Sequence, residues 1–399
     1  MNDPEQTTRP DGTRDRRVVI AGAGIAGLSA ALRLRRAGWE VLVVERAPGR
    51  RSGGYLVNLS GFGYDAARRL GLLPELTACD IGWFTSILVH ADGREKFTVP
   101  TELARAVVGS RMLSVFRGDV ETALYEAVRQ TVTIRFGTTV RAASQYPNGV
   151  RITLSDGSSV EADMLIGADG LHSRVRELIF GPGHRVDLGH IVTAFPLSRV
   201  PGEVPEGAGT TFIGPGRTAA VINVGPRRSS AFFTYRTGNP AAELSQGPVS
   251  ALRATFADLG GGVPEALCQL ESDPEAAYFD AVSQVVLPRW SDDRIVLLGD
   301  AAWCVTPFAG YGVGLALFGA DLLGTLLEEH GDDVAAAAAH WEQTLRPMVG
   351  KRQALARKGA ARFAPPTRLH VWLSEMTMRA MAVPGVRGAI RRSIERENA

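Results

Sequence analysis

Three glycines and one acid form the first group of residues whose types and spacing could do chemistry. Gly22, Gly24 and Gly27 follow one short apolar run, and Glu45 ends the next. A glycine-rich turn leaves backbone N–H groups free at a helix N-terminus, and the absent side chains let an anion approach closely. An acid about 20 residues later can accept hydrogen bonds from a ribose. The spacing predicts a dinucleotide-binding strand–helix–strand unit.

Two more glycine–acid turns follow apolar runs farther along the chain. Asp169 lies in the turn Gly167–Gly170, and Asp300 follows Gly299. Three glycines then lead into an apolar helical segment, Gly310, Gly312 and Gly314. A carboxylate at a strand end can bond to a sugar hydroxyl, and backbone N–H groups at a helix entry can meet an electron-rich ring edge. The two turns therefore indicate a site for the second part of an extended dinucleotide.

Composition excludes several classes of function. The chain has 399 residues with 44 basic and 42 acidic side chains, so bulk charge gives no support for nucleic-acid binding. Cys79, Cys268 and Cys304 are widely spaced, which indicates neither a disulfide framework nor a zinc site, and no metal site is expected. No long apolar stretch predicts a membrane span. We expect a cytoplasmic protein with a disordered tail at residues 1–16.

The element pattern predicts an α/β fold, a Rossmann-like nucleotide-binding domain with an inserted, mostly antiparallel β-sheet domain and C-terminal helices. We assign residues 17–85, 101–180 and 281–345 to the first domain, 86–100 and 181–280 to the inserted substrate domain, and 346–399 to the last helices. Helical periodicity is expected at residues 60–71, 118–130, 334–346 and 352–362. Hairpins are expected at 86–99 and 150–166, and single strands at 191–196, 210–213, 219–224, 231–235 and 294–298.

The three motifs, in this order, resemble the FAD-dependent aromatic hydroxylases, the para-hydroxybenzoate hydroxylase-like class A flavoprotein monooxygenases. The similarity is greatest to the branch of tetracycline-inactivating and polyketide-tailoring enzymes, and it covers residues 18 to about 345. It implies noncovalent FAD, reduction by NADH or NADPH, and O2 as co-substrate. It also implies hydroxylation of a polycyclic aromatic or polyketide-like molecule through a flavin C4a-hydroperoxide, by a monomer or weak homodimer.

The resemblance also implies roles for individual residues. Asp300 would contact the ribityl–pyrophosphate part of FAD, Asp169 would lie near the pyrophosphate and the route of NAD(P)H, and Arg117 would help to hold the flavin. The backbone of Pro307, Gly310 and Gly312 would pass beside the flavin ring and form the catalytic surroundings. The full set of expected cofactor contacts is Gly22, Gly24, Ile25, Ala26, Gly27, Glu45, Arg46, Arg51 (or its neighbour Arg50), Arg117, Asp169, Asp300, Gly310, Gly312, Val313 and Gly314.

Two departures from the family pattern concern the third motif. Trp303 stands where histidine is usual, and Gly314 and Gly319 stand where asparagine and aspartate are usual. We expect a loop that keeps its backbone role, loses side-chain contacts and leaves the flavin ring free to move. FAD affinity and ring mobility are the properties that these departures affect.

Aromatic side chains in both domains are candidates for a substrate pocket, although each is more often a core residue. They are Tyr55, Phe212, Phe232, Tyr235, Phe308 and Trp303. The histidines are expected to be structural or exposed, and the basic segment at residues 379–396 to be a helix on the domain edge. Two other functions stay open: a flavin-dependent dehydrogenase, oxidase or epoxidase acting on an alicyclic or isoprenoid substrate, and a non-enzymatic flavoprotein.

Overall fold

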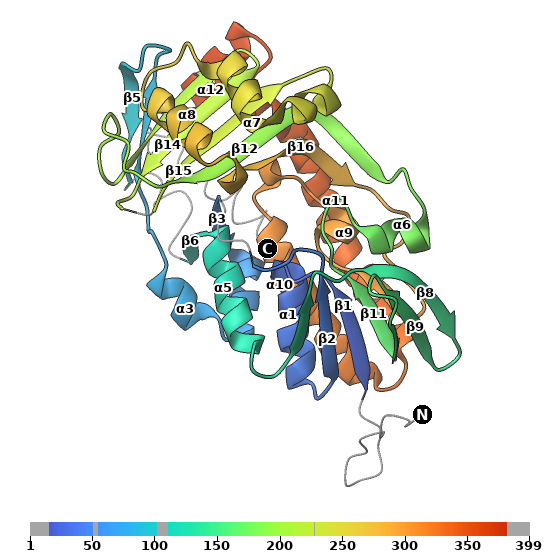
Figure 1. Ribbon diagram of the computed structural model, residues 1–399. Helices are drawn as coiled ribbons and strands as arrows, with labels where there is room; N and C mark the ends of the chain where they lie inside the picture. Colours follow the sequence, from blue (N-terminus) through green and yellow to red (C-terminus); the bar gives the residue numbers. More distant parts are fainter. Residues whose placement is uncertain (1–15, 51–54, 102–110, 227, 381–399) are drawn as a thin grey trace.

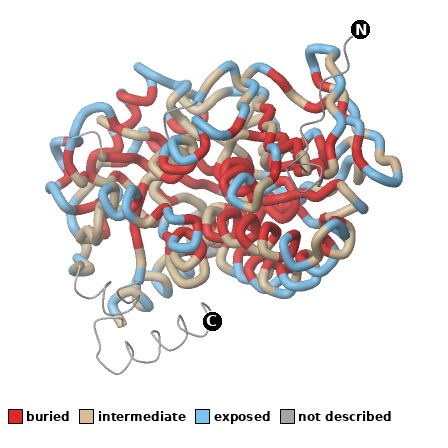
Figure 2. Tube along the Cα trace, turned by 90° about the horizontal axis from the view of Figure 1, so that it is seen from below, coloured by how far each residue is buried: buried red, intermediate tan, exposed pale blue. Residues whose placement is uncertain are grey.

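The computed structural model describes residues 16–50, 55–101, 111–226 and 228–380. Two large sheets carry most of the strands and lie one above the other in Figure 1. Buried segments gather in the interior, and exposed segments lie mostly at the periphery (Figure 2). Of the predicted tail only Arg16 is described, and Arg51 and the segment from residue 381 lie outside the described residues.

A six-stranded sheet forms the core of the lower layer, in the order β17-β18-β11-β1-β2-β7. Neighbouring strands are parallel except β17 and β18. The central strands are apolar because other elements cover them: α1 and a small sheet at residues 140–162 both contact them, and Val18, Val19 and Ile20 are fully buried. The bounds are β1 (Arg17–Ala21), β2 (Glu40–Glu45), β7 (Thr133–Phe136), β11 (Met164–Gly167), β17 (Ser291–Asp292) and β18 (Ile295–Leu297).

Helices and two small sheets complete this layer. The helices are α1 (Ile25–Arg36), α2 (Gly61–Arg69), α3 (Leu73–Ala78), α5 (Arg117–Val128), α6 (Arg174–Phe180), α9 (Asp300–Trp303), the short η2 (Pro307–Ala309), α10 (Gly312–His330) and α11 (Val334–Phe363). One small sheet pairs β3 (Leu56–Ser60) with β6 (Met112–Phe116). The other contains β8 (Val140–Tyr146), β9 (Gly149–Leu154) and β10 (Ser159–Ala162).

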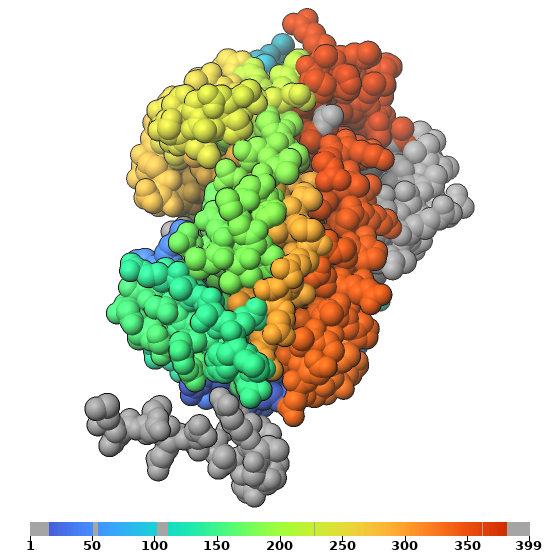
Figure 3. Space-filling view, turned by 90° about the vertical axis from the view of Figure 1, so that its right-hand side faces the viewer, coloured from blue at the N-terminus to red at the C-terminus, as the bar shows by residue number. Residues whose placement is uncertain are grey.

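The upper layer is a seven-stranded sheet in the order β16-β12-β15-β14-β13-β4-β5. All neighbours are antiparallel except β13 and β4, which confirms the predicted antiparallel character. In Figure 3, β12 (green) and β16 (light orange) lie side by side, with α11 (orange-red) along them. The bounds are β4 (Thr85–Val89), β5 (Glu95–Val99), β12 (Arg185–Leu197), β13 (Ala208–Gly214), β14 (Arg217–Asn223), β15 (Ser229–Arg236) and β16 (Tyr278–Val285).

The upper layer also contains two helices that the sequence reading missed. They are α7 (Pro240–Phe256) and α8 (Val263–Ser272), followed by a short η1 (Pro274–Ala276), and both pack on one face of the sheet. Frequent prolines and glycines in this segment predict β structure and turns. Pro240 and Pro264 instead lie in the first turn of each helix, where the missing N–H costs nothing.

Two other predictions of local structure need correction. The helices expected at 334–346 and 352–362 are one helix, α11, which continues through Pro347. The second arm of the hairpin expected at 150–166 is divided at Asp163, whose carboxylate accepts the Arg17 N–H at 2.7 Å. The residues before Asp163 pair with β9, and those after it enter the parallel sheet as β11. A further helix, α12 (Arg368–Ala380), follows the predicted break at two prolines.

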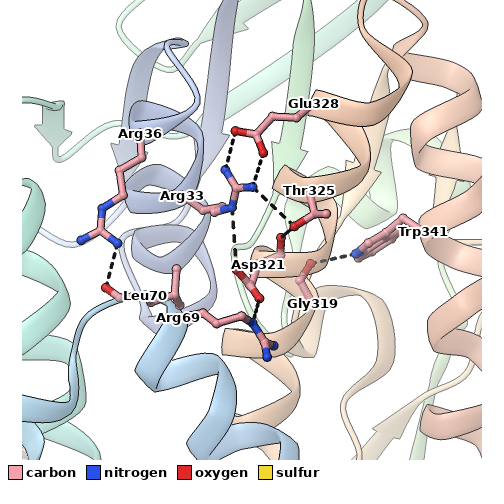
Figure 4. A network of polar contacts seen from close by, with 9 residues as sticks. All are labelled: Arg33, Arg36, Arg69, Leu70, Gly319, Asp321, Thr325, Glu328 and Trp341. Carbon is pink, nitrogen blue, oxygen red and sulfur yellow. Dashed lines mark hydrogen bonds and ion pairs between the residues drawn. The ribbon is translucent and has the colours of Figure 1, made fainter.

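A polar network fixes α10 against its neighbours (Figure 4). Asp321 of α10 accepts Arg69 Nε of α2 at 2.5 Å and lies 3.7 Å from Arg33 Nε of α1. Arg33 also pairs with Glu328 at 2.5 Å, and on the other side Trp341 Nε1 of α11 donates to the Gly319 carbonyl at 2.8 Å. The helix whose N-terminus follows the third motif is therefore held by three other helices.

In the part of the chain that the structure describes, no helix is long and apolar enough to cross a membrane. The same residues include no cluster of histidine, cysteine and acidic side chains suited to a metal ion.

We expect Asp321→Asn to lower the free energy of unfolding by about 1–3 kcal/mol, because Arg33 and Arg69 lose a carboxylate whose side chain is only 11% exposed. The Arg17–Glu40 pair is a matched control, since its side chains are 41% and 52% exposed. Glu40→Gln should cost less than ~1 kcal/mol. Urea unfolding followed by circular dichroism measures both variants, and equal losses would contradict the proposed importance of the network.

Candidate nucleotide and substrate site

The candidate site begins where four adjacent parallel strands end. In spatial order these are β18, β11, β1 and β2, with Ala21 paired to both Gly167 and Val44. The residues after these ends belong to the three sequence motifs, and Glu45 is the last residue of β2. The parallel arrangement therefore brings together at one edge motifs that are up to about 280 positions apart, because parallel strands share a carboxyl edge.

Close backbone packing shapes the first turn. A Cβ on Gly22, at φ +107°, would lie 2.4 Å from the Ala168 carbonyl oxygen, and one on Gly27 would lie 1.9 Å from the Gly22 oxygen. These two positions accept only glycine. Gly24 differs, because its Cβ would meet a single atom, Arg117 Nη2, at 3.9 Å. The space in front of Gly24 is open, as a phosphate cradle requires.

The acid after β2 is held by the same turn. Glu45 accepts the backbone N–H groups of Ala23 and Ala47, both at 2.8 Å. Each carboxylate oxygen keeps a lone pair that can accept a sugar hydroxyl. Of the expected neighbours, Arg46 is exposed, and Arg50 is turned to α5, where it donates to Thr122 at 2.7 Å.

The carboxylate of Asp169, in the second motif, is hydrogen-bonded to residues at the start of the helix that follows it, α6. Its carboxylate accepts Ser173 Oγ at 2.5 Å and the backbone N–H groups of Arg174 and Val175 at 2.7 and 3.1 Å. Burial raises the pKa of this carboxyl, and the three hydrogen bonds oppose the shift. Asp169 thus caps α6 and fixes the turn that packs on Gly22. The sequence pattern of an acid after glycine is the same for a cap and for a ligand contact.

Asp300 lies at the end of β18 as the first residue of α9, and its side chain is exposed. The protein atoms packed around this carboxyl group nevertheless displace much of the water near it, which raises its pKa, and the Arg117 charge and a hydrogen bond from Cys304 oppose the shift. Arg117, held by Glu121 at 2.8 Å, is therefore near both Asp300 and the open space at Gly24. Two acids and an arginine flank the edge that carries the open turn.

The chain after α9 is a tight loop that ends at the N-terminus of α10. Thr306 has φ +84°, Pro307 begins η2, and Gly310 has φ +68°. A Cβ on Gly310 or Gly312 would meet nothing within 4 Å, so both face open space. Ile25, Ala26 and Val313 lie in the first turns of α1 and α10, whose backbone N–H groups point toward this edge.

The sequence analysis placed Gly314 and Gly319 in the loop, and this prediction is wrong. Both lie within α10, where they permit close packing. A Cβ on Gly314 would be 3.2 Å from the Gly63 Cα of α2, and one on Gly319 would be 3.0 Å from the Trp303 ring. The unusual tryptophan and the unusual Gly319 therefore fit each other.

The predicted pocket aromatics divide between the two faces of the seven-stranded sheet. Phe212 and Tyr235 lie on the face covered by α7 and α8, where Tyr235 Oη donates to Glu243 at 2.8 Å. Phe232 and Phe308 lie on the opposite face in one apolar cluster. Phe308 is itself buried, stacked on Phe363 with ring centroids 4.5 Å apart. Phe212 and Tyr235 therefore do not stay among our candidates for substrate contacts.

Tyr278 is a candidate that the sequence reading missed. Its ring centroid lies 5.5 Å from that of Tyr55, and both rings are half-buried near Asp300. Burial raises the pKa of Tyr55 to about 12 and that of Tyr278 well above its usual value, so both phenols are neutral at pH 7. The sequence signal that could have identified Tyr278 is the alternation of side chains along a strand. Tyr278, Asp280 and Val282 share one face of β16, which is the face opposite α7 and α8.

The geometry fits an extended dinucleotide. From β18 to β2 the edge spans three strand spacings, about 14 Å at ~4.8 Å each, with an acid at each end and the open Gly24 turn between them. That length suits a ligand with two sugar-containing halves joined by a pyrophosphate. Glu45 and Asp300 can hold hydroxyl groups of the two halves, and Arg117 can neutralise phosphate charge.

Comparisons with known proteins agree with this geometry. The sequence profile of the FAD binding domain family matches residues 15–340. The flavin-dependent monooxygenase eupH of Phoma sp is 32% identical over 84% of this chain and 85% of the relative. The 6-hydroxynicotinate 3-monooxygenase of Bordetella bronchiseptica is 30% identical over 82% and 86%.

Among solved structures, that of the tetracycline destructase Tet(51) has a TM-score of 0.80 at 25% identity, covering 95% of this chain and 98% of that one. The family profile, the relatives and the fold agree with the motif set at the sheet edge. The chain belongs to the FAD binding domain family and is an FAD-dependent monooxygenase of the aromatic hydroxylase type.

Proposed function

We propose that this protein hydroxylates a small polycyclic aromatic or polyketide-like molecule, with noncovalent FAD, NADH or NADPH as reductant and O2 as oxygen donor. The observation that carries the proposal is the common edge of β18, β11, β1 and β2, where the three motifs and Glu45 meet. Relatives whose names describe flavin-dependent and aromatic-heterocycle monooxygenation support it. A monomer or weak homodimer suffices for this site.

In this proposal the residues of the chain bind and orient the cofactor. The open turn at Gly24 and the Arg117 guanidinium hold the pyrophosphate, while Glu45 and Asp300 accept hydroxyl hydrogen bonds. The N-terminus of α10 directs backbone N–H groups to the electron-rich edge of the flavin ring. FAD, when bound, supplies electron transfer and oxygen transfer.

The substrate is proposed to lie between this edge and the seven-stranded sheet. Residues 86–100 and 181–280 are proposed to supply most of the pocket, because the face of their sheet opposite α7 and α8 packs against Phe308 of the loop before α10. Phe232 lies on that face, and Tyr55 and Tyr278 lie half-buried beside Asp300. Neutral phenols next to aromatic and apolar groups suit a flat ring with a few polar substituents.

The direct test is oxygen incorporation. With a set of phenols and hydroxylated heteroaromatics, NAD(P)H and ¹⁸O2, we expect a product heavier by one labelled oxygen atom, with substrate accelerating NAD(P)H oxidation. Mass spectrometry of the product and an assay for hydrogen peroxide separate the outcomes. A converted substrate that gains no label, with O2 reduced only to peroxide, would identify an oxidase or dehydrogenase instead.

Gly24→Ala and Asp300→Ala should each weaken FAD binding about ten- to a hundredfold. The first puts a methyl group into the phosphate cradle. The second removes a charged hydrogen-bond acceptor worth roughly 1.5–3 kcal/mol. At φ −81° and ψ −175° Gly24 has a backbone that alanine adopts freely, so the fold should tolerate the change. Gly350→Ala, in open space on α11, is the matched control. Titration of flavin-free protein with FAD measures all three, and full affinity in the first two would place the nucleotide elsewhere.

Phe232 and Phe212 allow the substrate face to be tested with the same substitution at two half-buried positions on opposite faces of the sheet. We expect Phe232→Leu to raise KM about five- to tenfold, because a ring contact of ~1 kcal/mol is lost. Phe212→Leu, on the α7 and α8 face, should leave KM unchanged and affect only stability. The measurement is the KM of each variant in steady-state kinetics, with the substrate identified by oxygen incorporation. A raised KM in Phe212→Leu alone would put the pocket on the other face.

A further inference from the structure

Two buried glutamines hold the backbone that leads into the loop before α10. Gln353 Nε2 of α11 donates to the Val285 carbonyl at 2.7 Å and lies 3.3 and 3.4 Å from the Trp303 and Cys304 carbonyls. Gln284 Nε2 of β16 donates to the Gln353 carbonyl at 2.9 Å and lies 3.5 Å from the Val305 carbonyl. Three successive carbonyl groups, those of residues 303 to 305, thus face side-chain amides. We call these two side chains the amide clamp.

The clamp is fixed in orientation and is buried. Arg357 Nη1 donates to Gln284 Oε1 at 2.6 Å, which assigns Nε2 to the carbonyl side. Gln284 is fully buried and Gln353 is 9% exposed. A buried amide that lost its partners would be costly, so the clamp has one favourable arrangement.

The residue directly after the clamped carbonyls is strained. Thr306 has φ +84° and ψ +152°, a region that is essentially restricted to glycine and that a β-branched side chain strongly disfavours. Its hydroxyl is buried and has no hydrogen-bond partner among the described residues. Such a conformation persists only where the surroundings determine it, and the clamp supplies that determination on the N-terminal side.

The C-terminal side of Thr306 is anchored by Phe308. Its ring stacks on Phe363 of α11 at 4.5 Å and meets His190 of β12 edge-on at 5.6 Å. Helix α11 therefore contacts the loop both before and after the strained residue, through Gln353 and through Phe363. The backbone from Thr306 to Gly310 is held at both ends.

We propose that Gln353 and Gln284 are positioning residues that force Thr306 into its strained conformation and thereby set the backbone of residues 307–312 against the flavin ring. This inference rests on the proposed function, in which the ring lies beside that loop. A correctly set backbone couples NAD(P)H, a proton and O2 to substrate hydroxylation and release of water. A loosened backbone lets the same two electrons and two protons leave with O2 as hydrogen peroxide.

The fold offers a matched control for a buried glutamine. Gln269 of α8 is 8% exposed, accepts Ser198 Oγ at 3.1 Å and the Arg199 N–H at 2.9 Å, and donates to the Arg199 carbonyl at 3.1 Å. It satisfies backbone groups as Gln353 does, but it lies on the helix-covered face of the seven-stranded sheet, away from the loop. Gln353→Leu and Gln269→Leu should therefore lower the melting temperature similarly.

The readouts that separate the two variants concern the flavin. We expect Gln353→Leu to weaken FAD binding roughly tenfold, as for lost buried hydrogen bonds, to shift the visible spectrum of bound flavin, and to raise the peroxide fraction severalfold. Gln269→Leu should match the wild type in all three. Equal flavin properties in both variants would overturn the proposal. A wild type that binds no FAD would instead refute the proposed function.

Two further variants keep the test decisive. Arg357→Met removes the hydrogen bond from Arg357 to Gln284 Oε1, and Arg357 is exposed, so this variant should fold. It should change FAD affinity, the flavin spectrum and the peroxide fraction in the same direction as Gln353→Leu, but less. Thr306→Gly removes the strain, so Gln353→Leu should weaken FAD binding less in that background than alone. Flavin properties unchanged by Arg357→Met, or a Gln353→Leu effect that is undiminished in the Thr306→Gly background, would contradict action through the strained backbone.

Discussion

Direct contact of backbone with backbone at the carboxyl edge of the parallel sheet is the constraint on which the site depends. With 2.4 Å between a would-be Cβ on Gly22 and the Ala168 oxygen, the first and second motifs leave no room for a side chain between them. A would-be Cβ on Gly299 would likewise lie 2.7 Å from the Cβ of Ala26, so the third turn packs directly on the first helix. The three turns therefore position one another, and hydrogen bonds from backbone N–H groups hold Glu45 and Asp169 at the same edge.

The sequence was sufficient for the features in which residue type and spacing act together. The first strand–helix–strand unit, the mostly antiparallel sheet and the order of the motifs were all predictable, because a glycine turn, an apolar run and an acid are local signals. The face that a strand turns to the core, in contrast, depends on which distant elements pack on it, and local sequence does not show this. Phe212 and Tyr235 could be assigned only once α7 and α8 were seen to cover them, and those helices begin with prolines that suggested turns.

The departures at Trp303 and Gly319 illustrate a second limit of residue-by-residue reading. Taken singly, each suggested a lost contact and a looser loop. In the structure the Trp303 ring lies against Gly319 and packs with Trp290 and Trp341, at centroid distances of 4.9 and 5.5 Å. The two departures therefore belong to one packing arrangement, in which the large ring of α9 lies against the α10 residue that has no side chain. The loop after it is likewise held, by Phe308 and by the amide clamp.

The position of β18 has a consequence for how the chain folds. This strand pairs with β11, yet about 130 residues, including most of the upper sheet, separate them along the chain. During synthesis the edge of β11 stays unpaired until residue 297 has left the ribosome, long after β1, β2 and β11 are available. Pairs so distant in sequence form slowly, and an open strand edge invites association with other chains in the meantime. The order of translation therefore makes this part of the sheet, whose strand ends carry the candidate cofactor site, one of the last parts of the molecule to close.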